Sequence, residues 1–172
     1  MITIGTLLDS DRRWREFASP PEMDPLSEDD ALQEAQLLDV WIDASRSTVG
    51  LLFELRVALQ LREANTGVLI ARGVRELSWA AAPRSTKRTA WNVVGSQPVN
   101  HDGFALSLTT WPESRLSLRS ESAAFFVCNV PGLDRIPDYL SDEESVIRAN
   151  IASWHSPFLP VSAVFLDPAP RE

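Results

Sequence analysis

Apolar and polar residues alternate through the middle of the chain, and this period of two predicts β-strands. Between residues 49 and 59 every odd-numbered residue is apolar, from Val49 to Leu59. A helix would distribute these side chains around its circumference, whereas a strand places all of them on one face. Similar alternation, or a short apolar run, predicts further strands. They lie at 38–43, 68–71, 74–79, 91–94, 104–109, 116–118 and 123–128, with an edge strand at 161–166.

Short connections rich in Gly, Asn, Asp and Pro separate these segments. Turns are expected at 65–67, 100–103 and 111–114, and Gly73 predicts a bulge. Because strands joined by short turns run antiparallel, we expect an antiparallel meander of about seven strands. The predicted fold class is α+β, mainly β, with a curled sheet or a sandwich and short helices near both ends.

Capping residues followed by apolar residues at helical spacing predict these helices. One is capped by Asp9 or Ser10 and ends at Phe17, one follows Ser27, and one follows Ser141. No repeat or long linker divides the chain, which predicts a single domain, 1–172. Its parts are a helical or irregular lead at 1–36, the antiparallel sheet at 37–130, and a helix with an extended tail at 131–172.

Composition places the chain among ordinary globular proteins, with 172 residues and 44% hydrophobic side chains. The single cysteine, Cys128, excludes an intrachain disulfide. The sequence shows no signal-peptide pattern and no apolar run of roughly 18 residues, the length that a membrane span needs. We therefore expect a cytoplasmic protein with no membrane partner.

The formal net charge of −8 is unevenly distributed. Residues 1–45 carry 3 basic and 11 acidic side chains, 46–120 carry 10 and 5, and 121–172 carry 3 and 8. Nucleic acids require a positive surface, so a net acidic chain disfavours them as partners. The basic segment at 84–88, followed by Trp91, has residue types that suit single-stranded nucleic acid, but in a net acidic chain we expect it to be a solvated loop.

Residues suited to catalysis or metal binding form no recognisable motif. His101, His155 and Cys128 are the His and Cys residues of the chain, and no two of them have ligand spacing. Cys128 follows an apolar run, which predicts a buried structural thiol. Asp39 and Asp43 lie about 13 Å apart on one strand, too far for a glycosidase pair. We assign no catalytic residue, no metal site and no cofactor, and leave open a chemical role for either histidine.

Two segments concentrate carboxylates. Helix caps account for several of them, but carboxylates around an aromatic side chain also bind basic proteins, because charge steers the encounter and the aromatic residue anchors it. The first segment contains Glu22, Asp24, Glu28, Asp29 and Asp30. The second segment, together with a tryptophan beyond it, supplies the predicted partner-binding residues: Asp138, Tyr139, Asp142, Glu143, Glu144 and Trp154.

Three strand segments carry a resemblance to known proteins. They are 38–43, 48–55 and 67–74, the last ending in Gly73-Val74 and followed by Trp79. This order resembles small bacterial proteins, some of which are immunity proteins of toxin systems. The resemblance implies a β-rich binding protein without a cofactor, and it transfers no functional residue.

Three functional hypotheses follow. The first is a non-catalytic protein-binding module, an immunity-type inhibitor whose acidic surface covers a basic toxin or nuclease. The second is a small-molecule-binding protein, and the third is an enzyme of unrecognised type. The sequence leaves the partner, the oligomeric state and the sheet topology open. In the second hypothesis, an apolar pocket inside the curled sheet is lined by Trp41, Trp91, Phe104 and Trp154.

Overall fold

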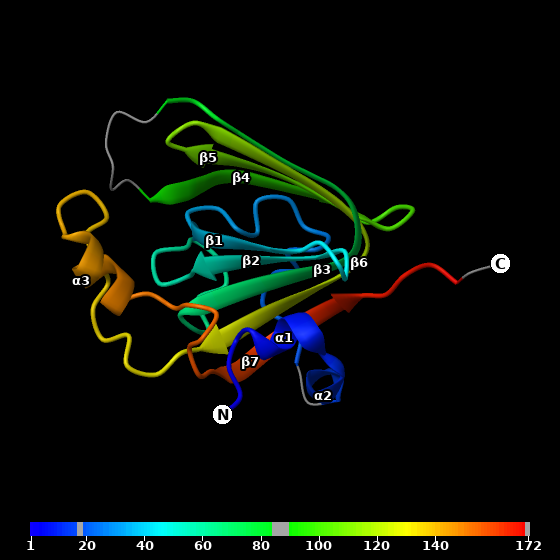
Figure 1. Cartoon of the computed structure of the whole chain (residues 1–172), viewed down its shortest axis with the longest axis horizontal. Helices are drawn as coiled ribbons and strands as arrows, with labels where there is room; N and C mark the ends of the chain where they lie inside the picture. Colours follow the sequence, from blue (N-terminus) through cyan, green and yellow to red (C-terminus); the bar gives the residue numbers. More distant parts are fainter. Residues whose placement is uncertain (17–18, 84–89, 171–172) are drawn as a thin grey trace.

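Figure 1 shows the computed structural model of the protein, which describes residues 1–16, 19–83 and 90–170. The described residues form seven strands in one antiparallel sheet, in the order β3-β2-β1-β4-β5-β6-β7. The predicted mainly β fold of the α+β class is confirmed. The strands are β1 (Gln36–Asp43), β2 (Thr48–Glu54), β3 (Thr66–Ala81), β4 (Trp91–Val99), β5 (Phe104–Trp111), β6 (Ser114–Asn129) and β7 (Leu159–Leu166).

Two long strands curl the sheet until it closes on itself. β3 and β6 each have 16 residues and pair with one another along their length. The first half of β6 also pairs with β5, and its second half pairs with β7. In Figure 1, β6 therefore links the upper layer, which contains β4 and β5, to the lower layer, which contains β7. The sheet is not a simple meander, because β4 follows β3 in the chain but pairs with β1.

Apolar side chains cover both faces of the lower layer. Every residue of β2 is buried. Leu51 and Phe53 point into the curled sheet, where they belong to the interior core together with Phe104 and Phe125. Leu52 belongs to a second core on the outer face. A strand buried on both faces needs apolar residues at successive positions rather than at alternate ones, and β2 has them.

Two short helices and a C-terminal segment cover the outer face. The helices are α1 (Thr6–Asp9) and α2 (Arg12–Arg15), and the segment is 152–158. The Arg72 guanidinium on β3 donates to the carbonyl oxygens of Leu7 and Leu8, each at 2.8 Å. It thereby satisfies carbonyls that a short helix leaves without a partner. Among the residues that the structure describes, no helix has the length and apolar character to cross a membrane.

Trp154 lies at the centre of this outer cover. Its side chain packs edge-on against Trp41, with ring centroids 6.2 Å apart, and Nε1–H donates to Asp39 Oδ2 at 2.9 Å. Gly50 permits the approach of the indole, because a Cβ at this position would lie 2.6 Å from Trp154 Cη2. The backbone of β2 and the Trp154 ring are therefore in direct contact.

We expect Gly50→Ala to lower the free energy of unfolding by about 1–3 kcal/mol, because the added methyl group must displace the indole. Urea unfolding measures this change. Gly95→Ala is the matched control, since the nearest atom to its Cβ would be Thr109 Oγ1 at 3.1 Å, on a side chain that can rotate. Equal losses in the two variants would contradict the packing of Trp154 on Gly50.

The helix predicted after Ser27 is wrong. This region forms a series of turns, with Asp30 and Glu34 at positive φ angles of 59° and 65°. An α-helix requires negative φ at every residue. The backbone N–H groups of Asp30 and Glu34 instead donate to the carbonyl oxygens of Ser96 and Val93 on β4. Pairing with a distant strand therefore overrides the local helix signal.

Other elements differ from the predictions in length. The strand predicted at 49–59 ends at Glu54, because the chain turns at 55–61. The strands predicted at 116–118 and 123–128 are parts of one strand, β6. The first predicted helix is present only as α2, whose N-cap residue is Asp11 rather than Asp9 or Ser10, and its expected end at Phe17 lies outside the described residues; α1 precedes the predicted helix and was not expected. The helix predicted after Ser141 is present as α3 (Glu144–Ala149).

Candidate functional site

Residues 131–151, called here the acidic loop, follow β6 and contain α3. They carry five carboxylates and two guanidinium groups. In Figure 1 the loop projects beyond one end of the sheet, at the left of the view. Five of the six predicted partner-binding residues, Asp138 to Glu144, lie in this loop.

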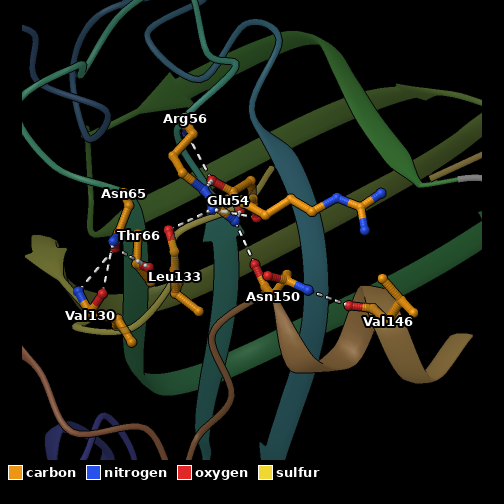
Figure 2. Close-up of polar contacts among 9 residues, drawn as sticks. Glu54, Arg56, Asn65, Thr66, Val130, Leu133, Val146 and Asn150 are labelled. Atoms are coloured by element: carbon orange, nitrogen blue, oxygen red, sulfur yellow. Dashed lines mark hydrogen bonds and ion pairs between the residues drawn. The ribbon is translucent and has the colours of Figure 1, made fainter. Parts of the chain in front are cut away.

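A buried ion pair at the end of β2 lies behind the acidic loop (Figure 2). The Glu54 side chain is 1% exposed and the Arg56 side chain is 13% exposed. Arg56 Nε donates to Glu54 Oε1 at 2.7 Å, and Nη2 donates to Oε2 at 2.5 Å. The hydrogen bond to Glu54 raises the pKa of Arg56 above its ordinary value, while burial acts in the opposite direction. A bidentate pair of this kind has a fixed geometry.

The same guanidinium binds the backbone of the acidic loop at both ends. Arg56 Nη1 donates to the carbonyl oxygens of Leu133 and Arg135, at 3.0 and 2.9 Å. Nη2 donates to the carbonyl oxygen of Asn150 at 2.5 Å. Residues far apart in the loop are therefore attached to one side chain in the turn that follows β2. Figure 2 shows these bonds converging on Arg56.

Asn65 fixes the chain immediately before the loop. Its Nδ2 donates to the Val130 carbonyl oxygen, and the Val130 N–H donates to Asn65 Oδ1, both at 2.9 Å. At the far end, Asn150 Nδ2 donates to the Val146 carbonyl oxygen at 2.8 Å. Side chains between β2 and β3, together with one from the loop itself, therefore hold the backbone at the two ends of the loop (Figure 2).

Two aspartates fold the loop internally. Asp142 accepts hydrogen bonds from Arg135 Nη2 at 2.7 and 2.8 Å and from the Asp138 N–H at 2.8 Å. Asp138 accepts from the Leu140 N–H and the Ser141 N–H, and these bonds, chiefly the first, lower its pKa. Asp138 and Asp142, both predicted to bind a partner, therefore shape the loop.

The predicted capping by Ser141 is absent. The N-cap residue of α3 is Glu143, and its side chain makes no capping hydrogen bond.

Tyr139 points into the protein rather than toward solvent. Its hydroxyl is buried and has no hydrogen-bond partner among the described residues. Burial raises the pKa of the Tyr139 hydroxyl well above its ordinary value; the Glu54 carboxylate raises it further, and Arg56 lowers it. The phenol thus stays protonated beside the Glu54–Arg56 pair and is not an exposed aromatic anchor.

The exposed apolar side chains of the loop are different ones. Ile136 is 47% exposed and Leu140 is 71% exposed. In the sequence, Ile136 lies three residues before Tyr139 and Leu140 directly after it, in a segment that also contains Asp134, Asp138 and the carboxylates at the start of α3. Our sequence reasoning did not select them. The available signal was an apolar residue on each side of Tyr139 in an otherwise polar segment.

The remaining predicted residues lie elsewhere. Trp154 is 5% exposed and belongs to the outer core, so it is not a surface anchor. The predicted pocket residues do not converge: Trp41 contacts Trp154 outside the sheet, Trp91 contacts Trp79, and Phe104 belongs to the interior core. Large apolar side chains fill that interior.

The residues considered for chemistry also lie apart from the acidic loop. The side chains of His101 and Asp102 are 87% and 91% exposed in a turn, with Nδ1 and Oδ2 3.1 Å apart. His155 is exposed, and Cys128 is buried, as predicted, with burial raising the pKa of its thiol. In the described part of the chain, no group of His, Cys, Asp and Glu has the arrangement of a metal site. The basic segment 84–88 lies outside the described residues.

Comparisons of the chain with protein-family models, with curated proteins and with solved structures gave no match. They do not bear on the resemblance to immunity proteins, which stays a prediction.

Proposed function

We propose that the protein is a non-catalytic, cytoplasmic binding module that engages a basic protein partner through its acidic loop, as an immunity-type inhibitor would. The observation that supports this proposal is the exposure of Leu140 and Ile136 among carboxylates, on a backbone fixed by Arg56. An apolar centre within a polar rim is the general arrangement of a protein–protein interface.

A fixed loop favours binding because less conformational entropy is lost when the partner arrives. The bonds from Arg56 and the bonds between Arg135, Asp138 and Asp142 already hold this loop in one shape. Asp142 and Asp138 contribute to that shape. Asp134, Glu143 and Glu144 are exposed and contribute negative charge at the surface, although Glu144 forms an ion pair with Arg148 at 2.8 Å.

The proposed binding has two steps that different residues control. Negative charge at Glu143 and Glu144 accelerates the encounter with a basic surface, an effect that salt weakens. Leu140 and Ile136 then fill apolar sites on the partner and slow its dissociation. The two steps can be separated experimentally, because charge reversal changes mainly the association rate and removal of the apolar anchor changes mainly the dissociation rate.

The test uses the immobilised full chain to isolate partners from an extract of the source cells, followed by kinetics with the purified partner. We expect Leu140→Asp to accelerate dissociation by about 30-fold, the effect of losing a hot-spot side chain. We expect the double variant Glu143→Lys, Glu144→Lys to slow association by about tenfold at low salt. Surface plasmon resonance measures both rates.

The matched control reverses two exposed carboxylates outside the loop, Asp29→Lys and Glu113→Lys, and changes the net charge by the same amount. It is expected to leave both rates close to those of the original chain. Recovery of no basic protein, or equal loss of binding in the control and the loop variants, would contradict the proposed function. Thermal unfolding of each variant confirms that the fold is retained.

A further inference from the structure

Among the residues that the structure describes, no strand lies beside the second edge of β1 for most of its length. β1 pairs with β2 from Gln36 to Asp43, but with β4 only at Gln36 and Leu37. Within the described ranges, residues 38–43 therefore have a strand on one side only. An uncovered edge presents backbone N–H and carbonyl groups to which another extended chain can bind.

An apolar hollow adjoins this edge. It has a volume of about 270 Å³ and is lined by residues 37–40 of β1 and by Trp79 and Trp91. The two indole rings meet edge to face, with centroids 5.0 Å apart. Trp79 is 42% exposed. The hollow is large enough to receive an apolar side chain from a segment that lies along β1.

The two faces of β1 differ in chemistry. Asp39 and Trp41 face outward, where both contact Trp154, and Asp43 follows two residues later on the same face. Val40 packs against the interior core. Ile42, on the face of Val40, is 61% exposed. A strand beside β1 would therefore meet carboxylates on one face and apolar side chains on the other.

At this edge the Asp39 carboxylate accepts a backbone hydrogen bond that a neighbouring strand would otherwise accept. The Val40 N–H donates to Asp39 Oδ1 at 2.8 Å, which indicates that this N–H is directed away from β2. The backbone N–H of Ile42 points toward the same edge, because the N–H groups of alternate residues in a strand point to the same side. The carbonyl oxygens of an added strand would accept hydrogen bonds from these N–H groups.

We propose that the β1 edge binds an extended segment of a protein partner in which basic and apolar residues alternate. The basic residues would face Asp39 and Asp43, and the apolar residues would face Ile42 and the hollow beside Trp79. A second copy of the chain fits less well, because antiparallel pairing of two β1 strands about Trp41 places Asp39 of one copy opposite Asp43 of the other. The site shares no residue with the acidic loop, so this inference does not depend on the proposed function.

The test measures binding of short synthetic peptides to the full chain by fluorescence anisotropy. The first peptide alternates Lys and Val. The second has the same composition with all Lys before all Val, and the third has the alternating order with N-methyl groups that remove its backbone donors. We expect the alternating peptide to bind at least about tenfold more tightly than either of the others, because only it combines two-faced complementarity with backbone hydrogen bonds.

Variants of the chain locate the binding site. Ile42→Pro removes a backbone N–H at the free edge without removing a hydrogen bond to β2. Trp79→Ala removes one wall of the hollow. Each variant is expected to weaken binding of the alternating peptide by about tenfold or more. Leu140→Asp, in the acidic loop, is expected to leave peptide binding unchanged, so failure here is distinguishable from failure of the proposed function.

Three results would overturn the inference. One is equal affinity for the three peptides, which would indicate charge attraction alone. Another is unchanged binding after Ile42→Pro. The third is a dimer of the free chain, detected by sedimentation and abolished by Ile42→Pro, which would assign the edge to a second copy.

Discussion

Replacement of Arg56 by Met is expected to lower the free energy of unfolding by about 3–5 kcal/mol, the cost of leaving a buried charge without its partner. The Glu54 side chain is 1% exposed, so bulk solvent does not hydrate its carboxylate in the native protein. The carbonyl oxygens of Leu133, Arg135 and Asn150 lose their donor in the same variant. Urea unfolding of the purified variant measures the loss.

The control removes both charges, with Glu54→Leu and Arg56→Met together. Because the buried carboxylate is then absent, we expect most of the lost stability to return. The acidic loop, however, stays without its attachment. Equal destabilisation in the single and double variants would show that the uncompensated charge is not the main cost of losing Arg56.

Replacement of Trp154 by Ala is expected to lower the free energy of unfolding by about 3–5 kcal/mol, and the melting temperature by roughly 6–20 °C. The indole is 5% exposed and contacts Trp41, Asp39 and the backbone at Gly50. Its removal leaves a cavity between the sheet and its outer cover. Differential scanning calorimetry measures the shift.

Trp154→Phe is the matched control. It retains an aromatic ring over Gly50 but loses the hydrogen bond to Asp39, which is exposed and can bind water instead. We expect a cost of no more than about 2 kcal/mol. A stable Trp154→Ala protein that fails to bind a partner would assign Trp154 to the interface rather than to the core.

The alternation of apolar residues predicted most strands because it reports which side of a strand is buried, a local property. It did not predict that β1 pairs with β4 or that β3 and β6 pair throughout, since those contacts depend on packing between residues far apart in the chain. The turn at Asp30 and Glu34 shows the same limit. Local capping residues favoured a helix there, and hydrogen bonds to β4 determined the structure.

The candidate site was predictable in its charge but not in its exposed anchors. The sequence shows where carboxylates gather, and it predicted Glu54 and Arg56 on the same side of a strand, although Arg56 lies in the turn after β2. It does not show that Arg56 reaches the backbone of Asn150, or that Tyr139 turns inward while Leu140 stays exposed. Those outcomes depend on the path of the loop, which tertiary contacts determine.

Hydrogen exchange of the acidic loop tests most directly the claim that Arg56 holds it in a fixed shape for binding. The double variant Glu54→Leu, Arg56→Met is compared with the original chain, using as reporters the amides of Asp142 and Ile147, which donate to Asp138 and Glu143. We predict that these amides exchange at least about tenfold faster in the variant, while amides of β6 are unchanged. Equal protection of the loop in both proteins would contradict the account.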